Sequence, residues 1–247
     1  MIDQYQILIA RTCSYGTEHA ELTNWMFRAA MSLRGDARCG AAYTQFHGEH
    51  RIHCARNELV QMAIDNKMDY LCFVDGDMDP DFRLWNDNAP DDKQYACARK
   101  WAKPFLPSSL NFMMTERCGI IGAPAVSGPP ANKLNVFLPR DTGEVPVSRM
   151  SHDEFINTPP SFSAVYAIGT GLMLIDMDVF KAIKEPWFED FWDHENKQRT
   201  PRLSQDCAFC AKCSDIGIPI YANFYAPAGH IKHQRQEPPE PVVFQEK

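Results

Sequence analysis

The chain has 247 residues, of which 45% are hydrophobic and 23% are charged, and its formal net charge is −7 at pH 7. These proportions are ordinary for a globular protein and exclude collagen-like, coiled-coil and wholly disordered chains. No apolar run approaches the roughly 20 residues that cross a bilayer, so we expect no membrane span.

Strand-like and helix-like segments alternate along the first part of the chain. A β-prone run at 6–10 precedes a helix at 22–33, whose apolar residues have helical spacing. A weak strand at 41–45 and a helix at 55–64 lead to the apolar run 70–74, which predicts a buried strand. This alternation predicts an α/β fold with a mostly parallel central sheet flanked by helices.

The second part continues the pattern. We expect strands at 119–123, 135–138, 164–168, 172–175 and 219–222, and helices at 178–184 and 205–216. Residues 87–116 lack clear periodicity, which predicts an insertion or lid. The Pro- and Glu-rich residues 236–247 predict a flexible tail. One domain over residues 1–235 accounts for the rest.

The strongest chemical signal is the segment FVDGDMDP, in which the predicted buried strand ends in Asp75, Asp77 and Asp79. Alternate residues of an extended chain share a face, so these carboxylates crowd together, and a divalent cation relieves their repulsion. Asp79 precedes Pro80 and is expected to be a helix N-cap with proline at the first helical position. A solvated acidic turn is the alternative for the other two carboxylates.

Two other motifs share part of this pattern. An EF-hand loop starting at Asp75 needs Gly at its sixth position and Glu at its twelfth, where this chain has Pro80 and Asn86. The segment also resembles haloacid-dehalogenase-type phosphatases, whose nucleophile follows an apolar strand in the pattern DxDx(T/V). Asp79 departs from the Thr/Val position, and a metal-dependent phosphatase with Asp75 as nucleophile is kept as an alternative.

Four segments in the correct order resemble GT-A-type glycosyltransferases, the nucleotide-sugar transferases with a DxD metal motif. They are the DGD sequence at 75–77, the helix and strand before it, the glycine-bearing segment 167–183, and the segment 203–233 with its terminal Gly-His. The resemblance implies a single GT-A-like, Rossmann-like domain, similar to small standalone bacterial, phage and viral members. It also implies a nucleotide-diphosphate sugar as donor and Mn²⁺ or Mg²⁺ as cofactor.

The resemblance assigns roles to individual residues. The implied metal site consists of Asp75, Asp77 and His230. Asp77 would bind the metal directly, His230 would be a further ligand, and Asp75 would contact the donor ribose and the water shell of the metal. Asp206 would be the general base of an inverting enzyme, although this chain has Gln205 where the family usually has Glu. Further donor contacts are implied for Arg11, Thr12, Arg56, Gly169 and Gly171.

These positions also have simpler explanations. Ser204 can cap the predicted helix, which would leave Asp206 as a stabiliser of the helix dipole. A bulge explains Gly169 and Gly171, and surface ion pairs explain the arginines. Trp187 is expected in the core.

The cysteines do not form a metal motif. Cys207, Cys210 and Cys213 lack a fourth local ligand, and on a helix they would share a buried side with Phe209 and Ile216. The chain has nine cysteines, an odd number, and its first residues do not form a signal peptide. We therefore expect a reduced protein in the cytoplasm, which would be the host cytoplasm if the chain is viral.

The expected function is hexosyl or pentosyl transfer to an acceptor that is a soluble glycan, a protein or a modified DNA base. The DNA hypothesis rests on basic residues in two segments, although the acidic net charge favours a solvated basic face. A non-catalytic sugar- or nucleotide-binding protein is a further alternative, which Gln205 leaves open. The basic residues are Arg99, Lys100, Lys103, Lys197, Arg199 and Arg202.

Overall fold

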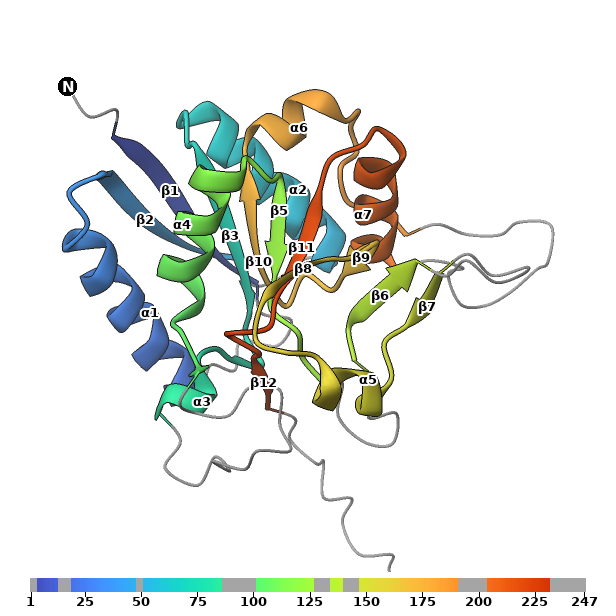
Figure 1. Cartoon of the computed structure of the whole chain (residues 1–247). Helices are drawn as coiled ribbons and strands as arrows, with labels where there is room; N and C mark the ends of the chain where they lie inside the picture. The colour runs from blue at the N-terminus through green and yellow to red at the C-terminus, as the bar shows by residue number, and fades with distance from the viewer. Residues whose placement is uncertain are drawn as a thin grey trace, which may run out of the picture.

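A seven-stranded sheet forms the centre of the computed structural model, which describes residues 4–12, 19–47, 51–85, 101–126, 134–139, 147–190 and 204–231 (Figure 1). Its strands lie in the order β2 (Cys39–His47), β1 (Tyr5–Thr12), β3 (Tyr70–Asp75), β10 (Leu172–Asp176), β5 (Ile120–Gly122), β11 (Ile220–Asn223) and β8 (Phe162–Ala164). Among these described strands, only β10 and β8 run against the other five. The mostly parallel α/β sheet is confirmed.

Helices cover both faces of the sheet. On one face lie α1 (Ala20–Arg34) and α4 (Phe105–Glu116), and on the other lie α2 (Ile52–Asp65), α6 (Asp178–Ala182) and α7 (Gln205–Asp215). Alternate strand residues supply the two cores, because successive side chains point to opposite faces. Leu8 packs in the core with α2, and Ile9 packs in the core with α1. The sheet is therefore buried on both sides.

Two small sheets extend the structure at the edge where Asp75 ends β3. One pairs β4 (Met78–Asp79) with β12 (Gly229–His230), and the other contains β7 (Val147–Arg149), β6 (Val136–Pro139) and β9 (Ala167–Ile168). The short helices are α3 (Phe82–Trp85) and α5 (His152–Asn157). Ser151 and Glu154 form a capping box at the start of α5, a signal visible in the sequence SHDE.

One predicted strand is divided in the structure. The strand expected at 164–168 is divided into β8 and β9, which belong to different sheets, because the chain crosses from β11 to β6 at its middle. Val165 N donates to Ile220 O, and Tyr166 N donates to Phe137 O, each over 2.9 Å. A continuous apolar run therefore does not reveal a change of partner strand.

The segment 87–116 is regular in its second part, where α4 packs against the sheet. Phe105, Leu106, Leu110 and Met113 are buried, and Ser109 shares their face without being apolar, which hid the periodicity. Residues 86–100 lie outside the described residues, so a lid there stays a prediction.

The expectation that Asp79 caps a helix is wrong. Asp79 lies in β4 opposite Gly229, and α3 begins only at Phe82. Asp81 is instead the buried carboxylate of this loop: it accepts from Trp25 Nε1 at 2.9 Å and from Phe105 N at 2.7 Å. It thereby ties the chain after the DGD sequence to both α1 and α4.

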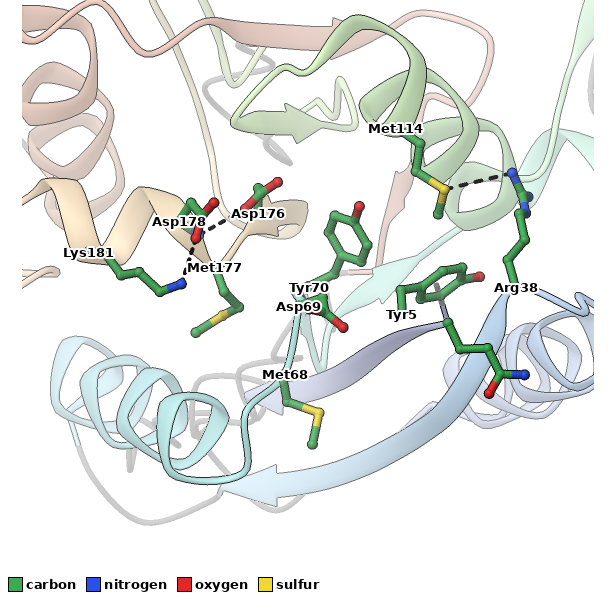
Figure 2. A pocket seen from close by; sticks show the side chains of 11 residues that line it. Tyr5, Arg38, Met68, Asp69, Tyr70, Met114, Asp176, Met177, Asp178 and Lys181 are labelled. Atoms are coloured by element: carbon green, nitrogen blue, oxygen red, sulfur yellow. Dashed lines mark hydrogen bonds and ion pairs between the residues drawn. The ribbon is translucent and has the colours of Figure 1, made fainter. Parts of the chain in front are cut away.

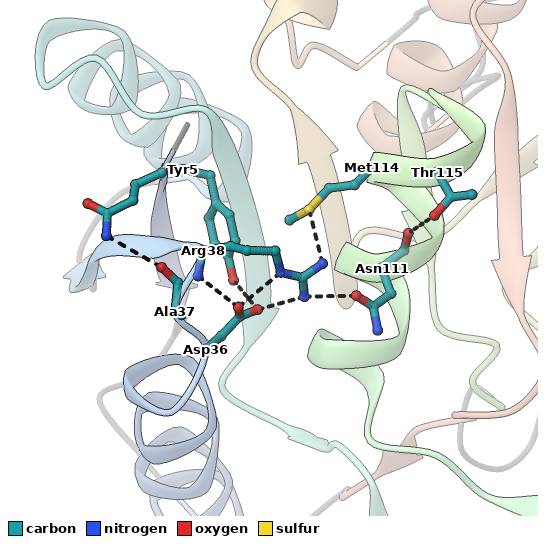
Figure 3. Close-up of polar contacts among 8 residues, drawn as sticks. Tyr5, Asp36, Ala37, Arg38, Asn111, Met114 and Thr115 are labelled. Carbon is teal, nitrogen blue, oxygen red and sulfur yellow. Dashed lines mark hydrogen bonds and ion pairs between the residues drawn. The ribbon is translucent and has the colours of Figure 1, made fainter. Parts of the chain in front are cut away.

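A second polar network joins the start of β2 to α4 (Figure 3). Arg38 Nη2 donates to Asp36 Oδ2 at 2.7 Å and to Asn111 Oδ1 at 2.8 Å, and Tyr5 Oη donates to Asp36 at 3.2 Å. The guanidinium lowers the pKa of Asp36 to about 2. The Asp36 carboxylate thus links Tyr5 of β1 to Arg38, which in turn contacts Asn111 of α4.

None of the helices in the described part of the chain combines the length and apolarity that a membrane-spanning helix requires.

Asp81 should give stability a specific dependence on pH. Burial raises its pKa from 3.8 to about 6, so the folded state holds this proton more tightly than the unfolded state. Its contribution to the unfolding free energy is complete below about pH 4 and is lost as pH rises through about 6, a difference of up to about 3 kcal/mol.

Urea unfolding between these pH values measures this fall. Asp81→Asn should remove it, whereas Asp153→Asn, at an exposed position of α5, should keep it. Equal pH slopes for the wild type and Asp81→Asn would contradict the assignment.

Candidate functional site

The site begins where β1 and β3 end side by side. Their parallel register pairs Thr12 with Asp75, and the four residues before Asp75, 71–74, are completely buried. Thr12 Oγ1 donates to Asp75 Oδ1. Parallel strands therefore bring these two predicted donor-binding residues together at the carboxyl edge of the sheet.

Arg56 of α2 holds the same carboxylate. Its Nη2 lies 2.8 Å from Asp75 Oδ1 and 2.9 Å from Oδ2, and Arg56 is only 2% exposed. Its guanidinium carbon lies 6.0 Å from the ring centre of Phe73 and 5.9 Å from that of Phe188. Arg56 is thus enclosed by rings and placed to orient Asp75, rather than exposed at the surface.

Asp77 and His230 meet although 153 residues separate them. The β4–β12 pair aligns His230 with Met78, and Ile231 N donates to Asp77 O at 2.7 Å. His230 Nε2 lies 2.7 Å from Asp77 Oδ2, and the Asp77 side chain is 49% exposed. The pair offers an oxygen and an imidazole nitrogen at one accessible point.

A divalent cation fits this pair only in part. Carboxylate and imidazole are both suitable ligands for Mn²⁺, and carboxylate suits Mg²⁺. The described residues contain no group of three or more His, Cys, Asp or Glu side chains that could hold a metal by themselves. Asp77 and His230 would therefore need oxygens from a ligand or water to complete the coordination, and Asp75 is engaged by Arg56.

The loop Gly169–Gly171 lies between the two groups of carboxylates. Asp75 N donates to Gly171 O at 2.8 Å. A Cβ on Gly171 would lie 2.9 Å from Met78 Sδ, and a Cβ on Gly169 would lie 3.0 Å from Asn135 Cβ. A side chain at either position would be crowded, by the flexible Met78 side chain at Gly171 and by Asn135 at Gly169.

Asp206 lies on the other side of this loop, in the first turn of α7. Its Oδ1 accepts from Ser204 Oγ and from Cys207 N, the latter at 3.0 Å. Its Oδ2 is 3.4 Å from the position of a Cβ on Gly169. Ser204 occupies the N-cap position but makes no capping bond with its side chain, so the expected cap is absent. One oxygen stabilises the helix start and the other faces the loop.

The remaining predicted residues are less informative. Arg11 lies in β1 opposite Val74, one residue before Thr12. Trp187 is in the core, as expected, and Lys103 Nζ lies 3.9 Å from the ring centre of Tyr225. The other basic residues of the acceptor hypothesis fall outside the described residues.

The cysteines of α7 are buried thiols, as expected. Burial raises the pKa of Cys207 to about 11 and that of Cys213 to about 12, and Cys210 Sγ lies 3.5 Å from Ile168 O. Ile216 does not extend this buried side, because α7 ends at Asp215 and Ile216 is 54% exposed.

Asn57 is a structural neighbour of the site to which the sequence analysis assigned no role. Its Nδ2 donates to Phe188 O at 2.8 Å, and its Oδ1 accepts from Phe188 N at 3.0 Å. Asn57 and Arg56 together connect α2 to Asp75 and to the segment that follows α6. Only the order Ala-Arg-Asn in the sequence could have indicated it, since a helical amide has no other distinguishing pattern.

An open pocket lies away from this site, at the opposite edge of the sheet. It has a volume of about 370 Å³ and is lined by Tyr70, Asp176 and Met114 among others (Figure 2). β3 begins there at Tyr70, whereas the candidate site lies at its other end. The pocket therefore shares no residue with the carboxylate site.

No family model and no curated protein matches the chain. Among solved structures, the crystal structure of A197 from STIV is similar over 92% of this chain and 86% of that one, with 14% identity and a TM-score of 0.56. GalNAc-T7 with UDP, GalNAc and Mn²⁺ has 11% identity and a TM-score of 0.44, over 94% of this chain and 44% of that one. A glycosyltransferase involved in glycosylation of the major capsid of PBCV-1 has 13% identity and a TM-score of 0.39, over 92% and 96%. The first similarity concerns the fold, and the chain has the GT-A-like fold expected from its sequence.

Arg56→Met should test the buried ion pair, since it keeps the aliphatic stem between the rings and removes the charge. Leaving Asp75 without its cation should cost about 3 kcal/mol of unfolding free energy in urea. In a double-mutant cycle with Asp75→Asn, the combined loss should be smaller than the sum of the single losses.

The matched control is Arg38→Met at the more exposed Asp36 pair, where the Arg38 side chain is 41% exposed. Its loss should be at most about 1 kcal/mol. Similar losses for both arginines would contradict a special role for the Arg56 pair.

Proposed function

We propose that the protein is a metal-dependent glycosyltransferase, which moves a sugar from a nucleotide-diphosphate donor to an acceptor hydroxyl with inversion. The observation that carries this proposal is the placement of two carboxylate groups around one glycine loop. The backbone N of Asp75 donates to Gly171 O, which brings the residue beside the loop, while Oδ2 of Asp206 faces Gly169. Donor binding and proton abstraction need such separate carboxylates at neighbouring places.

Asp77 and His230 are the residues that would hold the metal. Bound there, a divalent cation would neutralise the diphosphate as it leaves the sugar. The half-exposed carboxylate of Asp77 and the adjacent imidazole leave room for phosphate oxygens as the remaining ligands. The β4–β12 pairing and the hydrogen bond from Ile231 N to Asp77 O bring the two side chains together.

Asp75 has a different role. Arg56 contacts both of its oxygens and Thr12 donates to one of them, so its carboxylate is oriented and partly neutralised. A nucleophilic aspartate needs an uncommitted oxygen to attack phosphorus. This arrangement favours a carboxylate that contacts the donor over the phosphatase alternative, in which Asp75 would be the nucleophile.

Asp206 is suited to accept the proton of the acceptor hydroxyl. One oxygen is held by the helix start, which fixes the side chain, and the other faces the loop. A single base opposite the leaving group is the requirement of an inverting displacement. The acceptor stays a prediction: a soluble glycan, a protein or a modified DNA base.

Donor binding should depend on metal. With Mn²⁺, members of a panel of UDP-, GDP- and TDP-sugars should bind in calorimetry and release nucleotide, and EDTA should abolish both. Asp77→Asn should lose donor affinity more than His230→Gln, because the carboxylate also supplies charge. Asp65→Asn, at the exposed end of α2, is the control.

Equal donor affinity with and without metal would contradict this role for Asp77 and His230. Binding without nucleotide release would favour the non-catalytic alternative.

Asp206→Asn should separate binding from chemistry. The amide keeps the size of the side chain but cannot take a proton, so turnover should fall about 10²- to 10⁴-fold with little change in donor affinity. Steady-state kinetics and a thermal melt measure the two effects. Asp215→Asn, exposed at the other end of α7, should change neither. A lower melting temperature with unchanged turnover would restrict Asp206 to stabilising the helix.

A further inference from the structure

β2 forms one edge of the main sheet, on the side where α1 lies (Figure 1). Within the described part of the chain it pairs only with β1, and its register is continuous from Ala41 to His47 after a shift at its start. Its nine residues include no Asp, Glu, Lys or Arg, although the chain has a net charge of −7. Edge strands that face water are usually short or carry charged side chains, because an open row of backbone groups attracts another strand. β2 is long and uncharged, which favours a further strand as its neighbour.

The hydrogen bonds of β1 show which of its residues face β2. Asp69 N, just before β3, donates to Gln6 O at 2.9 Å, so Gln6 directs its carbonyl toward β3. Successive residues of a strand point their backbone groups to opposite neighbours, so Ile7 and Ile9 face β2.

Ala42 and Thr44 consequently direct their own backbone groups away from β1. They are the register partners of Ile7 and Ile9. In a parallel ladder, a residue bonds to the two residues on either side of its partner, and the partner itself faces the other way. Ala42 and Thr44 are both exposed, and among the described residues no strand lies on their outer side.

An exposed ring lies between these two residues. Tyr43 is 49% exposed, and it lies on the α2 face of the sheet, because its register partner Leu8 packs there. An aromatic side chain on a strand is stabilised by an aromatic neighbour directly across on the next strand. Tyr43 therefore offers a side-chain contact to the same strand that the backbone of β2 would bind.

α1 borders this edge on the other face, where Phe27 is 68% exposed and Met31 is 52% exposed. Trp25 is held toward α4 through Asp81. Phe27 follows Trp25 by two residues, which is about 200° around the helix, so it lies on the side away from α4 and toward β2. Met31 is one helical turn further along. A pair of exposed apolar side chains thus accompanies the open strand.

We propose that β2 pairs with β2 of a second copy of this chain, antiparallel and about a two-fold axis at Tyr43. A two-fold interface needs a strand that complements itself, and β2 carries no charge that would repel its copy. This register places Ala42 opposite the partner subunit's Thr44, so the residues with outward backbone groups exchange hydrogen bonds. It also places the two Tyr43 rings side by side.

The remaining exposed side chains fit this dimer. The axis is perpendicular to the joined sheet, so both α1 helices lie on one face, with Phe27 and Met31 beside the junction. The Tyr43 pair covers the junction on the other face. Because the paired strands run in opposite directions, the two edges that bear Asp75 face away from each other. The inference does not depend on the proposed transferase activity.

The test measures the oligomeric state by sedimentation velocity over a range of micromolar concentrations, where the wild-type protein should be a dimer. Ala42→Lys combined with Thr44→Lys sets lysine opposite lysine twice and should raise the dimer Kd about 10-fold or more. Ala42→Lys combined with Thr44→Glu sets opposite charges at the same places and should restore association.

The control is Ile216→Lys, which replaces an apolar side chain that is 54% exposed just after α7, far from β2 in the sheet order. It should leave the dimer unchanged. Circular dichroism should show the same secondary structure in every variant, so that a change in association reports on the interface.

A wild-type protein that stays monomeric at all these concentrations would overturn the inference, as would a dimer that the two lysines leave unchanged. Equal weakening by the Lys–Lys and Lys–Glu variants would overturn the antiparallel pairing at Tyr43. A monomer that dimerises only after deletion of residues 236–247 would assign β2 to the tail instead of a second copy.

Discussion

The candidate site depends on the pairing of Arg56 with Asp75. A carboxylate that directly follows the buried residues 71–74 is unfavourable unless a cation or several donors accompany it. Arg56 supplies the cation from α2, and the ring centres of Phe73 and Phe188 lie 6.0 Å and 5.9 Å from its guanidinium carbon. Because β3 lies between β1 and β10, the position of this carboxylate determines where the DGD loop starts.

Two further contacts place the remaining polar residues relative to Asp75. Asp81 anchors the end of the DGD loop to α1 and α4, and β12 pairs with the middle of the loop so that His230 reaches Asp77. On the opposite side, the hydrogen bond from Asp75 N to Gly171 O holds Asp75 next to the loop that Asp206 faces. The polar residues are thus placed by backbone pairing and buried hydrogen bonds, while the helices supply the apolar support.

The sequence predicted the elements whose periodicity is strong, together with the carboxyl-edge location of Asp75 and Asp77. It did not predict α4, because Ser109 lies on the buried face, or the buried Asp81, which has no local pattern. The contact of Asp77 with His230 was anticipated only through resemblance, since no spacing rule relates residues so far apart. Arg56 was expected at the nucleotide, and its burial against Asp75 depends on rings contributed by distant segments.

The β4–β12 pairing also has a consequence for biosynthesis. The strands of the main sheet come from residues 5 to 223. His230, which contacts Asp77, is synthesised 153 residues after it. A nascent chain that ends after β3 contains Arg56 and Asp75 but lacks Phe188, which packs against the Arg56 guanidinium, and His230, which contacts Asp77. Loops closed over such distances are slow to form and contribute late in folding. The Asp77–His230 pair is thus completed only after translation has passed β12, so a shorter nascent chain lacks the pair proposed to bind the metal.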